Sequence, residues 1–122
     1  MRLNYAIVTV SDMKQAVKFY RDVVGLALKF ESPGWTEFVT EGATLALHSA
    51  GPQNAGAAPA HAGPGSCRPG FGVADIDEFH KRMLEHQVRS IQPPKETFGV
   101  RIAQYSDPDG LVFSVAEHRN QK

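Results

Sequence analysis

His48 is the side chain in this 122-residue chain whose type and position best suit chemistry. An imidazole can bind a metal or move a proton near neutral pH, but it needs a second ligand or an orienting partner to do so. Tyr5 could act as a general acid or base under the same condition. Cys67 adjoins Arg68, and a nearby cation can lower the pKa of a thiol, but strand alternation turns these two side chains apart. The remaining histidines show no spacing typical of metal ligands: His61, His80, His86 and His118.

The sequence lacks the patterns of several common functional classes. It contains no nucleophile elbow, no phosphate-binding glycine loop and no paired-carboxylate pattern. Its single cysteine can form neither an internal disulfide nor a zinc-binding pair. Lys and Arg together number 13, as do Asp and Glu, so the formal net charge is zero. Because nucleic-acid binding usually requires a basic excess, we expect no nucleic-acid or membrane partner.

Composition and hydropathy indicate a soluble single-domain protein. Hydrophobic residues make up 42% of the chain and charged residues 21%, as in globular proteins. No apolar run approaches the roughly 20 residues that a membrane-spanning helix needs. The first residues, Met1–Tyr5, do not show the pattern of a signal peptide. These features predict a cytoplasmic location.

Turn-forming and small residues dominate positions 49–66, which we interpret as a linker between two halves. In the first half, Ser11 or Asp12 is expected to cap a helix that ends at Gly25. Strands are predicted around this helix at Tyr5–Val10, Leu26–Glu31, Trp35–Thr40 and Ala43–His48.

The second half repeats the same order of elements. Asp75 is expected to cap a helix over Ile76–His86, and Asp107–Gly110 has the composition of a tight turn. Strands are predicted at Arg68–Val73, Arg89–Gln92, Val100–Tyr105 and Leu111–Ala116. A shift of 63 positions places Val10 on Val73 and Asp12 on Asp75, which indicates an internal duplication.

Strand alternation separates an apolar face from a mixed face in each half. The apolar positions are expected to pack on the helices: Val8, Val10, Leu45, Leu47, Phe71, Val73, Phe113 and Val115. The mixed face carries the remaining strand positions: Tyr5, Ile7, Thr9, Ala46, His48, Arg68, Gly70, Gly72, Val112 and Ser114. This face either lines a cleft or meets solvent, and the two glycines would leave room for a ligand.

Four segments resemble the vicinal oxygen chelate superfamily, which includes glyoxalase I, extradiol dioxygenases, and the fosfomycin- and bleomycin-resistance proteins. The segments are Val-Ser-Asp-Met at 10–13, Lys-Phe-Tyr-Arg-Asp-Val-Val-Gly-Leu at 18–26, Gly-Val-Ala-Asp-Ile-Asp at 72–77 and Asp-Pro-Asp-Gly at 107–110. The resemblance implies an α+β fold of two βαβββ modules that form an eight-stranded open cup. Module one would span 1–48 and module two 67–122 of a single domain, and family members commonly form homodimers.

Metal-dependent members of this superfamily hold one divalent metal at four strand positions. The resemblance maps these positions onto Tyr5, Ala46, Arg68 and Ser114. None of the four is an imidazole, carboxylate or thiolate, and a guanidinium repels a cation. We therefore expect no metal and no other cofactor, with His48 as the residue that could serve a shifted metal site.

The interpretation that fits these residues is a metal-free cup that sequesters a small molecule, as in the bleomycin-resistance branch, which serves antibiotic resistance. Arg68 would favour an anionic or carbonyl-rich ligand, and the neutral net charge argues against cationic bleomycin itself. The predicted ligand-binding residues are Tyr5, Ile7, Trp35, His48, Arg68, Val112 and Ser114. The alternatives are a metal-dependent or metal-free lyase, isomerase or dioxygenase of the same superfamily, and a purely structural subunit.

Overall fold

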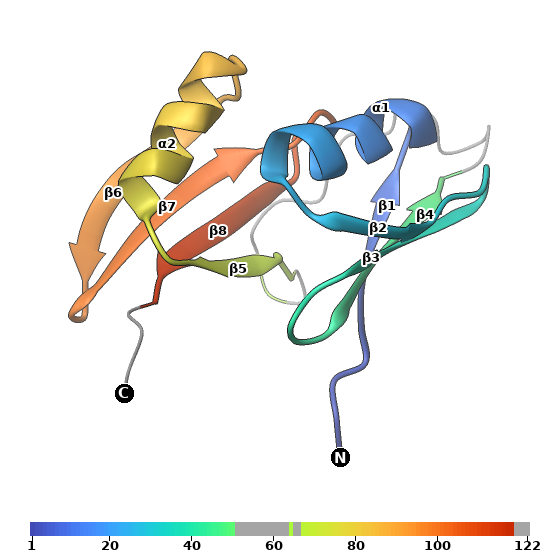
Figure 1. Ribbon diagram of the computed structural model, residues 1–122, viewed down its shortest axis with the longest axis horizontal. Coiled ribbons are helices and arrows are strands. Elements are labelled where there is room, and N and C mark those ends of the chain that lie inside the picture. Colours follow the sequence, from blue (N-terminus) through green and yellow to red (C-terminus); the bar gives the residue numbers. More distant parts are fainter. Residues whose placement is uncertain (51–63, 65–66, 119–122) are drawn as a thin grey trace. The chain divides into compact units, whose positions relative to one another are not determined.

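The computed structural model describes residues 1–50, 64 and 67–118 (Figure 1). The chain divides into two compact units, Met1–Ala58 and Pro59–Lys122. Each unit contains one four-stranded sheet and repeats the order strand, helix and three strands. The expected α+β architecture of two βαβββ modules is confirmed.

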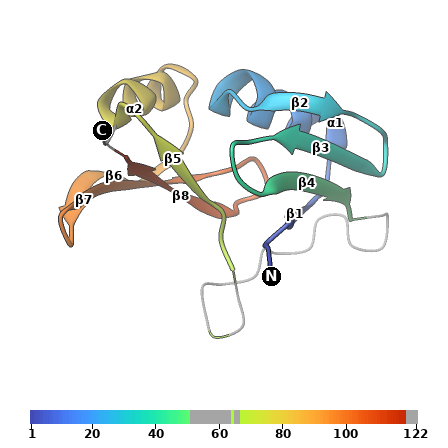
Figure 2. The same cartoon turned by 60° about the horizontal axis from the view of Figure 1, so that its bottom comes forward.

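The first module consists of β1 (Tyr5–Val10), β2 (Ala27–Phe30), β3 (Trp35–Val39) and β4 (Thr44–Ser49), in the spatial order β1-β4-β3-β2 (Figure 2). β4 runs parallel to β1 and antiparallel to β3. The predicted linker 49–66 falls largely outside the described residues. At its start, however, Ser49 is the last residue of β4 and pairs with Val10, so the strand runs one residue further than expected.

One continuous helical segment follows β1. Helix α1 (Met13–Lys18) is capped by Asp12, whose carboxylate accepts a hydrogen bond of 3.1 Å from the Gln15 N–H. It continues as the π-helix η1 (Phe19–Val24), which the sequence pattern did not distinguish from an α-helix. The segment ends at Gly25, whose φ of 99° lies in the left-handed region that glycine tolerates best.

The predicted apolar face of the first sheet is confirmed as the face that packs on this helix (Figure 1). The sheet contributes buried Val8, Val10, Leu45 and Leu47. The helical segment contributes buried Met13, Ala16, Val17 and Tyr20. Because alternate strand residues point to opposite faces, this burial leaves the other set of side chains on the side of the sheet away from the helix.

The second module contains β5 (Gly70–Val73), α2 (Ile76–Glu85), β6 (Ser90–Thr97), β7 (Val100–Ser106) and β8 (Val112–Glu117), with strand order β5-β8-β7-β6. Asp75 caps α2 by accepting a hydrogen bond of 3.1 Å from the Glu78 N–H. None of the described helices is long and apolar enough to cross a membrane.

Strand β6 is longer than the predicted Arg89–Gln92 because the strand continues through Pro93 and Pro94. Proline interrupts a ladder of hydrogen bonds and is tolerated at a sheet edge or a bulge. β6 is an edge strand of its sheet, and its register against β7 shifts between Gln92 and Lys95. The two prolines therefore mark an irregularity in the strand, where the sequence pattern suggested its end.

The Asp107–Gly110 turn is confirmed and joins β7 to β8. The Asp107 carboxylate accepts hydrogen bonds from the N–H groups of Asp109 at 2.9 Å and Leu111 at 2.8 Å. The Gly110 N–H donates to the Asp107 carbonyl at 2.9 Å. This segment is a structural turn in which the buried carboxylate satisfies backbone donors.

Tyr105 occupies the centre of the second module's core. It is fully buried and lies against the rings of Phe79 and Phe113, and its hydroxyl is hydrogen-bonded to His80 Nδ1 at 2.8 Å. Burial raises the pKa of the Tyr105 phenol to about 12, compared with about 10 in an unfolded chain. The folded state therefore retains the phenolic proton more tightly than the unfolded state does.

We predict that the free energy of unfolding falls between about pH 10 and pH 12 in part because unfolded Tyr105 releases its proton. The replacement Tyr105→Phe removes this contribution. Denaturant titrations at several pH values measure the free energy of unfolding of wild type and variant. The difference between the two should be constant below about pH 10, and wild type should lose stability relative to the variant between about pH 10 and pH 12. Parallel curves throughout would contradict the prediction.

Candidate functional site

The side of the first sheet that faces away from the helix carries most of the residues predicted to bind a ligand. In the parallel pairing of β1 with β4, Tyr5 lies opposite Thr44, Ile7 opposite Ala46 and Thr9 opposite His48. Ile7 is 58% exposed and Tyr5 48% exposed, which are high values for large apolar side chains in strands. The mixed face is thus an open surface with exposed apolar groups.

Three of the predicted ligand-binding residues form a cluster that we call the aromatic face: Tyr5, Trp35 and His48. They come from β1, β3 and β4, and Trp35 is the direct cross-strand partner of His48. The ring centroids of Tyr5 and Trp35 are 6.4 Å apart and those of Trp35 and His48 are 6.0 Å apart, both edge to face. Such geometry is favourable between aromatic rings.

Glu37 completes this region, although no sequence motif marks it as a functional residue. Its side chain is only 10% exposed, and its carboxylate accepts a hydrogen bond of 2.8 Å from Trp35 Nε1. Lys29 Nζ lies 3.7 Å from the same carboxylate. Trp35 and Glu37 are two residues apart in a strand, which places both side chains on one face. This spacing is the sequence feature that could have indicated Glu37 as a neighbour of Trp35. Glu37 fixes the orientation of the indole.

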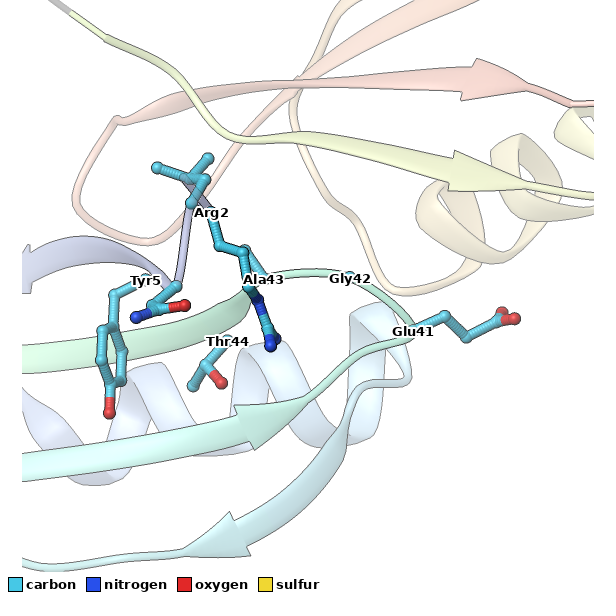
Figure 3. A pocket seen from close by; sticks show the side chains of 8 residues that line it. Arg2, Tyr5, Glu41, Gly42, Ala43 and Thr44 are labelled. Carbon is cyan, nitrogen blue, oxygen red and sulfur yellow. The ribbon is translucent and has the colours of Figure 1, made fainter.

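A hollow of about 450 Å³ adjoins the aromatic face at one end of the first sheet (Figure 3). It is lined by Arg2, Leu3, Asn4, Tyr5, Glu41, Gly42, Ala43 and Thr44. The Arg2 guanidinium and the Thr44 side chain point into it beside the Tyr5 ring, whereas Glu41 points away (Figure 3). The Asn4 carbonyl accepts a hydrogen bond of 2.9 Å from the Thr44 N–H, which joins the chain before β1 to β4.

Arg68 does not occupy the predicted strand position. Strand β5 begins at Gly70, and Arg68 is an exposed residue ahead of it. Pro69 has no N–H to donate, although its carbonyl accepts a hydrogen bond of 2.9 Å from the Ser114 N–H. The expectation that Arg68 lies on the mixed face of a strand is wrong, because the strand starts after this proline.

The predicted residues Val112 and Ser114 lie in β8 on the mixed face of the second sheet, and both are half-buried. Ser114 pairs with Gly70 on one side and Gln104 on the other. Gln104 in turn lies opposite Gln92. This face therefore has polar groups at its centre, Gln92, Gln104 and Ser114, where the first module's face has aromatic rings.

The two glycines of β5 differ in the space beside them. Nothing lies within 4 Å of a Cβ built on Gly70, so this position is open. A Cβ on Gly72 would lie 2.8 Å from His118 Cδ2, so the His118 ring occupies the space that the sequence suggested for a ligand. His118 is a further residue of this face that the sequence pattern did not place, since it follows β8.

Two of the four residues that the family resemblance maps onto metal positions offer no donor to a divalent cation. Ala46 is fully buried and has no donor atom, and Arg68 is cationic. The Glu37 carboxylate beside Ala46 already bonds Trp35 and faces Lys29. Within residues 1–50, 64 and 67–118, no group of three His, Cys, Asp or Glu side chains is arranged to hold a metal ion.

Residues 2–115 match the Glyoxalase/Bleomycin resistance protein/Dioxygenase superfamily. The chain belongs to this superfamily. Among solved structures, it is similar to TnmS3, an antibiotic-binding protein from Streptomyces sp. CB03234, with 31% identity, a TM-score of 0.74, and coverage of 96% of this chain and 95% of TnmS3.

Two further members of the fold show how widely it is used. A protein of unknown function from Agrobacterium tumefaciens str. C58 is 27% identical, with a TM-score of 0.76 and coverage of 97% of this chain and 94% of that one. A lactoylglutathione lyase from Agrobacterium tumefaciens is 24% identical, with a TM-score of 0.72 and coverage of 93% and 91%, a likeness that shows the fold alone. None of the curated proteins compared with the chain matches it.

We predict that Glu37→Ala releases the Trp35 indole. Loss of the carboxylate acceptor should move the indole Nε1–H resonance upfield and lower the free energy of unfolding by about 1 kcal/mol. This resonance is unique because the chain has one tryptophan. Glu37→Gln retains an acceptor and should shift the resonance less, and Glu31→Ala, an exposed change, should leave it in place. An unmoved indole resonance in Glu37→Ala would contradict the prediction.

Proposed function

We propose that the protein binds a small organic molecule without a metal and holds it unchanged. The ligand would lie against the aromatic face of Tyr5, Trp35 and His48, with the exposed Ile7 beside it. Val112 and Ser114 of the second module stay predictions from the sequence. The observation that carries the proposal is this cluster of aromatic rings on an open sheet face, held in place by Glu37.

Exposed aromatic and aliphatic groups on one surface favour binding of a flat apolar molecule. Covering them removes apolar area from water, and each aromatic contact adds about 0.5–1.5 kcal/mol beyond that burial. The hydrogen bond from Trp35 to Glu37 holds the indole before the ligand arrives, so less side-chain freedom is lost on binding.

The polar groups of the aromatic face support binding over catalysis. A general base needs a partner that orients it. Within the described parts of the chain, neither the Tyr5 hydroxyl nor the His48 ring nitrogens form a hydrogen bond. These atoms are therefore available to a ligand's polar groups.

The similarity to TnmS3 supports the same reading, because that protein binds an antibiotic and is 31% identical over nearly the full length of both chains. We extend to this chain only the binding of a small molecule. Antibiotic resistance, a homodimer and a cytoplasmic location stay predictions from the sequence. The eight-stranded cup is likewise a prediction from the family resemblance.

Titration of the full chain with 2-naphthamide, an uncharged flat aromatic probe, tests the proposal. We expect a saturable shift of the Trp35 indole resonance in the presence of EDTA. Tyr5→Ala and His48→Ala should each raise the Kd about fivefold, since each removes one aromatic contact.

His86→Ala serves as the matched control because His86 ends helix α2 in the other module and is exposed. It should bind the probe as wild type does. Absence of a saturable shift in wild type, or equal loss of affinity in all three variants, would overturn the proposal.

A further inference from the structure

The hollow at the end of the first sheet carries a cationic group directly beside the aromatic face. Tyr5 belongs to both, because its ring contacts Trp35 and also lines the hollow. Thr44 lies opposite Tyr5 in the strand register, so both side chains point to the same side of the sheet. The Arg2 guanidinium extends over this end of β4 beside the Thr44 side chain (Figure 3).

The polar side chains of Arg2, Tyr5 and Thr44 have no partners in the part of the chain that the structure describes. No carboxylate there forms an ion pair with Arg2, and the hydroxyls of Tyr5 and Thr44 form no hydrogen bonds. Glu41 also lines the hollow, but its side chain points outward (Figure 3). The Arg2 guanidinium and the Thr44 hydroxyl thus lie side by side in this space, next to the Tyr5 ring.

The Glu37 carboxylate does not neutralise the positive charge of Arg2. Glu37 is the anionic group of the aromatic face, and its oxygens already accept a hydrogen bond from Trp35 and face Lys29. Arg68, the cation expected to select the ligand's charge, lies ahead of β5 in the other module. Arg2 is the cation placed to take that role.

We propose that the ligand is an aromatic acid whose carboxylate is bound by Arg2. This inference rests on the proposed function and deepens it by assigning the ligand's chemical class. The aromatic ring lies against Tyr5 and Trp35, and the carboxylate extends into the hollow. There the guanidinium donates hydrogen bonds to it, and the Thr44 hydroxyl is placed to donate another.

The test compares 2-naphthoate with its uncharged isostere 2-naphthamide on the full chain, with the Trp35 indole resonance as the readout. We expect 2-naphthoate to bind about fivefold more tightly at low salt. Arg2→Gln should bring the two Kd values together by weakening only the acid. Arg2→Lys, which keeps the charge, should preserve much of the preference.

Arg21→Gln is the matched control. Arg21 lies in η1 on the opposite side of the first sheet, where it pairs with Asp22. The Arg21→Gln substitution removes one positive charge, as Arg2→Gln does, and should leave the preference for 2-naphthoate over 2-naphthamide intact. Equal binding of both probes by wild type, or a preference that survives Arg2→Gln, would overturn the inference while the proposed function stands. Failure of both probes to bind would overturn the two together.

Discussion

The parallel pairing of β1 with β4 is the constraint on which the first module depends. Val8 and Val10 in β1 and Leu45 and Leu47 in β4 must face the helix together, since these buried side chains form its core. A slip of one residue would turn every one of these groups to the opposite face of the sheet, so the register is strongly fixed. The residues between them are then forced outward, and Tyr5, Ile7, Thr9 and His48 face away from the core as a consequence of how the core packs.

The two modules use one scaffold for different surfaces. Both have the same strand order and an aspartate-capped helix, Asp12 in one and Asp75 in the other. The outward face of the first sheet is aromatic around Trp35, and that of the second is polar around Gln104 and Ser114. The positions onto which the family resemblance maps metal ligands include Ala46, which has no donor atom, and Arg68, which is cationic. The two sheets thus share a scaffold and differ in the side chains that they present.

Local patterns predicted the strands, caps and faces because alternation and capping depend on neighbouring residues. The convergence of Tyr5, Trp35 and His48 followed from predicted faces, but their ring contacts depend on the pairing of three strands. The sequence does not predict the burial of Glu37, because a carboxylate in a strand is usually solvated. Its burial results from the Trp35 indole and Lys29 beside it. Arg2 precedes the first strand, where no periodicity assigns a direction. Two prolines resemble a strand end, so the sequence pattern predicts too short a strand at β6. Strand β5 begins only after Pro69, so Arg68 lies outside it.

Metal-free binding of an organic ligand by the aromatic face can be observed by native mass spectrometry. The full chain is incubated with 2-naphthoate and EDTA and desolvated gently. We expect a complex heavier than the free chain by one 2-naphthoate per chain, with no metal increment, and less of this complex in Arg2→Gln. A complex that forms only after a divalent metal is restored, with a stoichiometric metal increment, would show that binding depends on a metal.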